Sequence, residues 1–435
     1  MEQKVNAPWN LFGKSSGMNG SKYLKQRYDT IENKIKSLSK LRDILGLEKH
    51  NDIEESQWDA IESQLFLAQS KFLSRLKKLS SELFRNVNDM QSLRSLNEQL
   101  GKVELDLSRS FSFYDTFLDI LSQRLLPGIG PILKGCDVLA NDSIRKNHPA
   151  LSTLTKPIVY FDRGFGASTR REGVWLYSGS KNPITTIQIP YTKIKTKYDL
   201  TSIVHEAGHS IMVRLGLERE LSKEIRESLA LAGASELMQN GFASWSKEIG
   251  PDFWGFLNCG IAQALATREL LSLPQKEVFS ISFNDPHPPP FLRVLIVLDW
   301  CRRQWGAGEW DEWESEWRYL YPLTMASEMN RKILKEGEKF IHVVSRVLFR
   351  TRFKNLGFKT IPSLFNMEDV SPNHFRRILS EAKYSGILNL ADLSPCGQLG
   401  FFGYLRANSK ISEETLDRLM TRWLIQFGKR KLFLN

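Results

Sequence analysis

The stretch "TSIVHEAGHSIMVRLG", residues 201–216, contains two histidines four positions apart, and a glutamate directly follows the first. On an α-helix, residues i and i+4 lie one above the other, so His205 and His209 can present their imidazoles to one point in space. Neutral imidazole is a common zinc ligand, and Glu206 lies beside this face, where it could deprotonate a zinc-bound water. The motif predicts a helix that supplies two metal ligands and a general base.

The residues around the motif favour a buried helix. Ile203, Val204, Ala207 and Ile211 are all uncharged, as a helix packed on both sides of a metal site requires. Gly208 costs about 1 kcal/mol of helix stability relative to alanine, which a close neighbour would explain. The alternative is that both histidines are structural core residues on an ordinary helix.

A catalytic zinc needs a third protein ligand and keeps one position for water. The segment "KEIRESLALAGASELMQNGFASW", residues 223–245, offers Glu224, Glu227 and Glu236. If this segment is one helix, Glu227 and Glu236 point in opposite directions, so only one of them can reach the metal. The small residues on the face of Glu236 would let two helices approach closely, which favours Glu236. Glu227 is the alternative ligand, or a surface charge paired with Lys223.

Hydrophobic periodicity indicates the fold class. Residues from about 20 to 125 repeat apolar side chains at three and four positions, which predicts long amphipathic helices packed on each other. The segments 157–167 and 182–194 are rich in β-branched and aromatic residues and are the clearest strand candidates. Helical patterns return at about 198. We therefore predict a mostly α protein with a small β-sheet (α+β).

Breaks in these patterns suggest three regions. We predict an N-terminal helical domain over residues 1–150, a zinc-binding catalytic core over 151–335, and a helical basic C-terminal region over 336–435. The core would contain the strands and the helix that carries the histidines.

The chain resembles the gluzincin metallopeptidases, in particular the mostly helical group of oligoendopeptidase F, thimet oligopeptidase, carboxypeptidase Taq and angiotensin-converting enzyme. The resemblance is carried by the HExxH helix and by Gly233-Ala-Ser-Glu236, which has the G-x-x-E shape seen in several members. It implies a zincin-like core flanked by long helices, with one Zn²⁺ held by His205, His209 and Glu236, and Glu206 as general base.

The same resemblance implies hydrolysis of peptide bonds, with short or unfolded peptides as substrates. In these families Tyr or His residues downstream of the zinc helices stabilise the oxyanion, and the candidates here are His287, Tyr319 and Tyr321. Substrate peptides are commonly held by adding a strand to a sheet edge, and "ITTIQIP", residues 184–190, is the expected edge strand. Its alternative role is a plain core strand.

Composition limits the other function classes. No apolar run of 18 or more residues is present, the first residues lack the apolar core of a secretory signal, and the four cysteines share no short ligand spacing. We therefore expect a cytoplasmic protein with reduced thiols and no membrane partner.

The formal net charge of +11 and the sequence pI of about 9.3 permit nucleic acid as a partner without requiring it. The competing hypothesis is a helical scaffold or binding protein, for nucleic acid among other partners, with structural zinc or none. A structural site would be closed by four protein ligands, and no Cys or His follows His209 before Cys259. This spacing favours catalysis; the oligomeric state stays open.

Overall fold

The computed structural model describes residues 20–38, 41–46, 53–83, 90–164, 166–174, 181–385, 388–408 and 411–429. The described chain is mostly helical with one three-stranded sheet, so the predicted fold class is confirmed. The chain divides into two compact units. The first unit comprises Met1–Asn51, Trp58–Leu118 and Trp175–Ser180, and the second comprises Asp52–Gln57, Asp119–Val174 and Lys181–Asn435.

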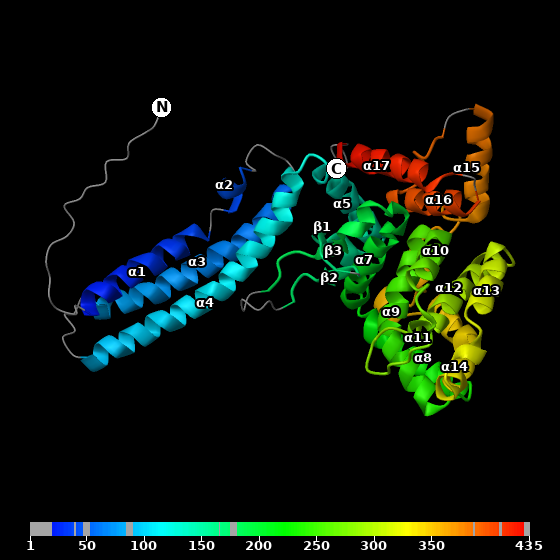
Figure 1. Cartoon of the computed structure of the whole chain (residues 1–435), viewed down its shortest axis with the longest axis horizontal. Coiled ribbons are helices and arrows are strands. Elements are labelled where there is room, and N and C mark those ends of the chain that lie inside the picture. The colour runs from blue at the N-terminus through cyan, green and yellow to red at the C-terminus, as the bar shows by residue number, and fades with distance from the viewer. Residues whose placement is uncertain are drawn as a thin grey trace. The chain divides into compact units, whose positions relative to one another are not determined.

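The first unit is built from long helices. Its helices are α1 (Gly20–Ser37), α2 (Leu41–Leu45), α3 (Glu55–Leu83) and α4 (Met90–Ser122), of which α3 and α4 each extend by a few residues into the second unit. Helices α1, α3 and α4 run side by side (Figure 1). Leu24, Ile31 and Ile35 of α1 are buried at the spacing of one helix face, and Arg27 Nη2 lies 3.0 Å from Glu104 Oε2 of α4. The amphipathic pattern at 20–125 was therefore correctly interpreted as packed helices.

The second unit contains the sheet and the other helices of the described chain. Its strands are β1 (Ile158–Asp162), β2 (Ser168–Arg170) and β3 (Thr186–Pro190). Its helices are α5 (Gly130–Ile144), α6 (Pro149–Ser152), α7 (Thr201–Arg214), α8 (Leu217–Leu231), α9 (Glu236–Cys259), α10 (Ile261–Leu270), α11 (Gln275–Val278), α12 (Pro290–Trp305), α13 (Glu309–Leu320), α14 (Glu328–Arg350), α15 (Pro372–Ser385), α16 (Pro395–Asn408) and α17 (Glu413–Lys429).

The sheet has the strand order β1-β3-β2. β3 pairs with β1 in parallel, with Ile158 opposite Thr186, and with β2 in antiparallel, with Thr169 opposite Ile187. The segment 184–190 was expected at the sheet edge, but its strand β3 lies in the centre and both of its sides are occupied. The sequence could not distinguish these positions, because a strand rich in Ile and Thr has the same pattern whichever neighbours it pairs with. In the described sheet the short strand β2 forms an edge instead.

Helix α7, which carries the HExxH motif, lies in the core of the second unit. It packs against α9, α5 and the sheet, and Ile203, Val204 and Ala207 are fully buried. A Cβ added at Gly208 would stand 3.0 Å from Pro251 Cα of α9. The close neighbour predicted for Gly208 is therefore the backbone of α9, and the missing side chain lets the two helices cross at short range.

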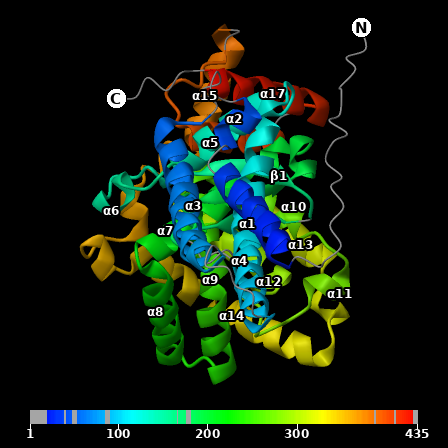
Figure 2. The same cartoon turned by 90° about the vertical axis from the view of Figure 1, so that its left-hand side faces the viewer.

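The units divide the chain differently from the three predicted regions. The helical part of the first unit ends at Leu118 rather than near 150, because α5 packs on β1 and α7 and so belongs with the sheet. The C-terminal helices are not a separate region, since α14 packs on α8 and α12 and α17 packs on α5. Helices α8 and α9 also pack on each other, and they run side by side in the view of Figure 2. Repeated amphipathic patterns reveal helices but not which helices share a core.

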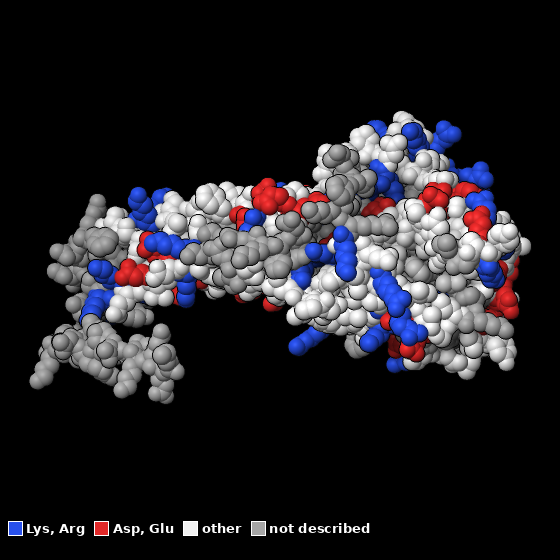
Figure 3. Space-filling model, turned by 90° about the horizontal axis from the view of Figure 1, so that it is seen from above, with Lys and Arg blue, Asp and Glu red and all other residues white. Residues whose placement is uncertain are grey.

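The charges of the described surface are mixed. On the face drawn in Figure 3, acidic side chains lie among the basic ones on both units. Within the described residues, no helix is both long enough and apolar enough to cross a bilayer.

Candidate metal centre

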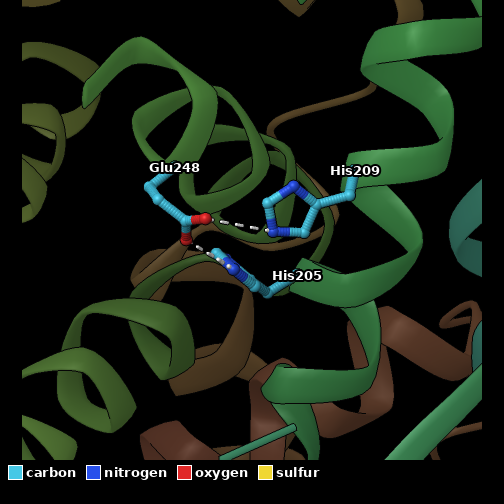
Figure 4. A group of neighbouring side chains, drawn as sticks. All are labelled: His205, His209 and Glu248. Carbon is cyan, nitrogen blue, oxygen red and sulfur yellow. Dashed lines mark ion pairs between the residues drawn. The ribbon is translucent and has the colours of Figure 1, made fainter. Parts of the chain in front are cut away.

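Two imidazoles of α7 and one carboxylate of α9 point toward one another (Figure 4). His205 Nε2 lies 3.3 Å from Glu248 Oε2, and His209 Nε2 lies 3.5 Å from Glu248 Oε1. One ligand atom from each of these three residues lies within 4.8 Å of the other two. Among the described residues, no other group of three or more His, Cys, Asp or Glu brings its ligand atoms this close together. The three side chains are between 8% and 23% exposed, so the group opens to solvent on one side.

This donor set fits a zinc ion. Bonds of 2.0–2.1 Å in a tetrahedral site place neighbouring ligand atoms about 3.3–3.4 Å apart, close to the two observed nitrogen–oxygen separations. Two imidazoles and one carboxylate also form a common ligand set of catalytic zinc, which keeps a fourth position for water.

A buried acid and a buried arginine support the group from behind. Asp252 lies one turn after Glu248 on α9, and its Oδ1 is 2.8 Å from His205 Nδ1. Arg293 of α12 donates two hydrogen bonds to Asp252, from Nε over 2.6 Å and from Nη2 over 3.0 Å, and its Nη2 is 3.5 Å from Glu248 Oε2. A carboxylate behind a metal-binding histidine fixes the ring orientation, so Asp252 holds Nε2 of His205 toward Glu248.

Burial and charge set the pKa values of these groups in the metal-free protein. Burial opposes the charged form of His205, but the Asp252 carboxylate outweighs it and raises the pKa of His205 to about 10. Burial lowers the pKa of His209 to about 4, and the charge of His205 adds to the effect. Burial opposes ionisation of Glu248, yet contact with the two imidazoles holds its pKa below the usual range. The imidazole of His209 is therefore neutral at pH 7, whereas that of His205 must lose a proton before it can bind a metal.

Glu206 lines a cleft of about 740 Å³ together with both histidines. Glu206 is 7% exposed, and burial raises its pKa to about 7. A carboxylate with such a pKa can both accept and release a proton near neutral pH, as a general base must. The edge strand β2 lines the same cleft through Ser168 and Thr169.

The structure brings one of the three predicted oxyanion candidates to the site. His287 lines the cleft, its Nε2 lies 3.5 Å from Glu248 Oε2, and its Nδ1 lies 2.5 Å from Asp285 Oδ1. Tyr319 is 85% exposed on α13 and does not line the cleft. The hydroxyl of Tyr321 donates a hydrogen bond to the carbonyl of Leu273, which lies on the cleft wall, but Tyr321 itself does not line the cleft.

The predicted third ligand, Glu236, lies elsewhere. The segment 223–245 is not one helix, because a turn that includes Gly233, at φ +78°, separates α8 from α9. Ser235 caps α9 by accepting a hydrogen bond from the Met238 amide, and Glu236 is the exposed first residue of that helix. Glu236 precedes Glu248 by twelve residues, about 18 Å along the axis. Glu227 is 58% exposed on α8 and pairs with Lys223 over 3.8 Å, as its alternative interpretation expected.

Sequence reasoning missed Glu248 and Asp252, although a signal for them exists. The stretch "WSKEIGPDFWGF", residues 245–256, places two acids four positions apart in a run of aromatic and apolar residues. Asp and Glu are seldom buried unless they are paired or bind a metal, so two acids on one face of an apolar helix indicate such a site.

Comparisons of the chain with protein-family models, with curated proteins and with solved structures give no match. The functional assignment therefore depends on the geometry of this site.

Proposed function

We propose that the protein is a zinc-dependent metallopeptidase that hydrolyses peptide bonds of short or unfolded peptides. One observation carries the proposal: ligand atoms of His205, His209 and Glu248 lie within 4.8 Å of one another, and Glu206 lines the same cleft. Three ligands leave a position for water, whereas a structural zinc site is closed by four protein ligands.

The residues of the chain have separate roles in this reaction. A zinc ion held by His205, His209 and Glu248 would lower the pKa of a bound water and polarise the scissile carbonyl. Glu206 accepts the proton of the attacking water on its carboxylate and passes it to the leaving amine. His287 faces the site with Nε2, and its Nδ1–H can donate to Asp285 Oδ1; with both ring nitrogens protonated, Nε2–H can donate to the developing oxyanion.

The cleft also suggests how a peptide is held. Among the described residues, β2 pairs with β3 alone, and its residues Ser168 and Thr169 line the cleft. An extended peptide could add to this edge as a further strand, with its backbone hydrogen bonds independent of side-chain identity. Short or unfolded peptides fit this arrangement because their backbone groups are free to pair.

The test combines metal analysis with a cleavage assay. The purified protein should contain about one zinc per chain and should cleave members of a mixed peptide library, read by mass spectrometry, until a chelator is added. Glu206→Gln should keep the zinc and lower turnover by at least about 100-fold, the contribution of a positioned general base. Glu227→Gln, which removes an exposed carboxylate of α8, is the matched control and should keep both zinc and turnover.

Two results would contradict the proposal. Cleavage that survives in Glu206→Gln would remove this residue from its role. A protein that binds no zinc, cleaves no peptide and instead binds DNA or RNA in a salt-sensitive manner would support the binding hypothesis.

A further inference from the structure

The cleft contains a second polar centre, distinct from the metal ligands. Lys193 lies in the short helix η4 (Tyr191–Ile194), and Asp199 lies in η5 (Lys197–Leu200), just before α7. Both line the cleft and form an ion pair with each other. Thr267 of α10 lines the same cleft and is 4% exposed, and α10 contacts η5, the short helix that carries Asp199.

Lys193 is a buried cation with donor capacity to spare. Its side chain is 7% exposed, and Asp199 is the one carboxylate found in an ion pair with it among the described residues. Burial lowers its pKa to about 8, although the charge of Glu269 opposes this shift. The Glu269 carboxylate is itself engaged, since it accepts hydrogen bonds from Tyr198 and Arg406. An ammonium has three N–H donors, so a second anion could bind beside Asp199.

Thr267 supplies a second donor. Its hydroxyl oxygen accepts a hydrogen bond from Gln263 Nε2 over 3.3 Å, and the same Nε2 lies 3.4 Å from Asp252 Oδ1. The hydroxyl hydrogen of Thr267 therefore stays available for an acceptor in the cleft. A substrate ammonium would instead compete with Lys193 for Asp199 and would be repelled by it.

We propose that Lys193 and Thr267 form a carboxylate-binding subsite, which selects peptides with a carboxylate close to the scissile bond. This inference rests on the proposed peptidase function and names its substrate class. The carboxylate is either an acidic side chain next to the scissile bond or the free C-terminus of the peptide. Thr201 and Ser202, which begin the HExxH helix α7 directly after η5, line the same cleft, so the subsite and the metal ligands share one cleft.

The test uses one cleaved peptide with Glu, Gln, Lys or Leu placed in turn on either side of the scissile bond. Each peptide is made with a free C-terminus and as the C-terminal amide, which distinguishes the two sources of the carboxylate. A charge-assisted hydrogen bond in a desolvated site predicts that kcat/KM falls by roughly 10-fold to 100-fold from Glu to its isostere Gln, or from free acid to amide.

Two variants locate the preference. Lys193→Met combined with Asp199→Asn removes the ion pair without leaving a buried unpaired charge, and should make the acidic and amide peptides nearly equal. Thr267→Val keeps the shape of the side chain and should lower the preference by about 3-fold to 10-fold, the value of one hydrogen bond. Lys247→Met, which removes an exposed lysine from the same cleft, is the control for loss of a cation there and should keep the preference.

The outcomes separate this inference from the proposed function. Cleavage of all peptides with equal kcat/KM would overturn the subsite and leave the peptidase standing. A preference that survives unchanged in the double variant and in Thr267→Val would also overturn it. Absence of all peptide cleavage by the zinc-loaded protein would overturn both. Calorimetric binding of the same peptides to zinc-loaded Glu206→Gln gives a second reading that does not depend on turnover.

Discussion

The identity of the third ligand gives the sharpest test of the metal centre. Glu248→Gln replaces the carboxylate that lies 3.3 and 3.5 Å from the two imidazoles with a neutral amide of the same shape. Loss of a residue behind a zinc ligand typically costs 10-fold to 100-fold in affinity, so loss of an anionic ligand should cost at least about 100-fold, or ~2.7 kcal/mol. A competition titration against a chromophoric chelator measures this change.

Glu236→Gln is the matched control because it removes the same charge from the same helix. Twelve residues along α9 place Glu236 about 18 Å from Glu248, where one unit charge acts on another with only ~0.2 kcal/mol in water. Salt screens this further, since the Debye length is about 8 Å at physiological ionic strength. Zinc affinity should therefore change less than about 1.5-fold. An equal loss of zinc in both variants, or a loss in Glu236→Gln alone, would refute the assignment of Glu248.

Three further outcomes follow from the geometry around α7. Asp252→Asn should lower zinc affinity by about 10-fold to 100-fold while the far-UV circular dichroism stays unchanged, because it weakens the contact that orients the His205 ring. Unaltered zinc affinity would exclude this orienting role of Asp252. Zinc binding at pH 7 should release at least one proton, because the pKa of His205 is raised to about 10 and this imidazole must lose its proton to bind zinc. Zinc affinity should therefore rise about tenfold per pH unit below that pKa. Calorimetry in buffers of different ionisation enthalpy should detect the released proton. Gly208→Ala should lower the free energy of unfolding in chelator by about 1 kcal/mol, because overpacking against Pro251 outweighs the gain in helix propensity; a higher melting temperature would show that α7 and α9 separate without strain.

The local parts of the site could be predicted from the sequence because they depend on contacts within one turn of helix. His205, Glu206 and His209 have fixed spacing, and the apolar residues around them predicted the burial of α7. Gly208 predicted a close neighbour, and Pro251 occupies that place. The long helices of the first unit were equally predictable, since their periodicity extends over many turns.

The third ligand could not be chosen in the same way. Glu236 matched a family pattern and stood among small residues, but the turn at Gly233 makes it the first residue of a new helix. Where α9 crosses α7 decides which acid meets the imidazoles. That crossing occurs at Gly208 and Pro251, which directly precedes Asp252 and lies about one turn after Glu248. The partners of β3 were likewise invisible, because pairing is formed between distant segments.

The sequence by itself determined a buried helix that presents two imidazoles and a carboxylate, together with a mostly helical fold around a small sheet. The tertiary structure alone decided which acid completes the group, which strand forms the cleft edge, and which residues such as Lys193 and Thr267 share the cleft. The physical reason is range: spacing along one helix is set by the backbone geometry of a few residues, whereas the meeting of two helices depends on how all of their side chains pack.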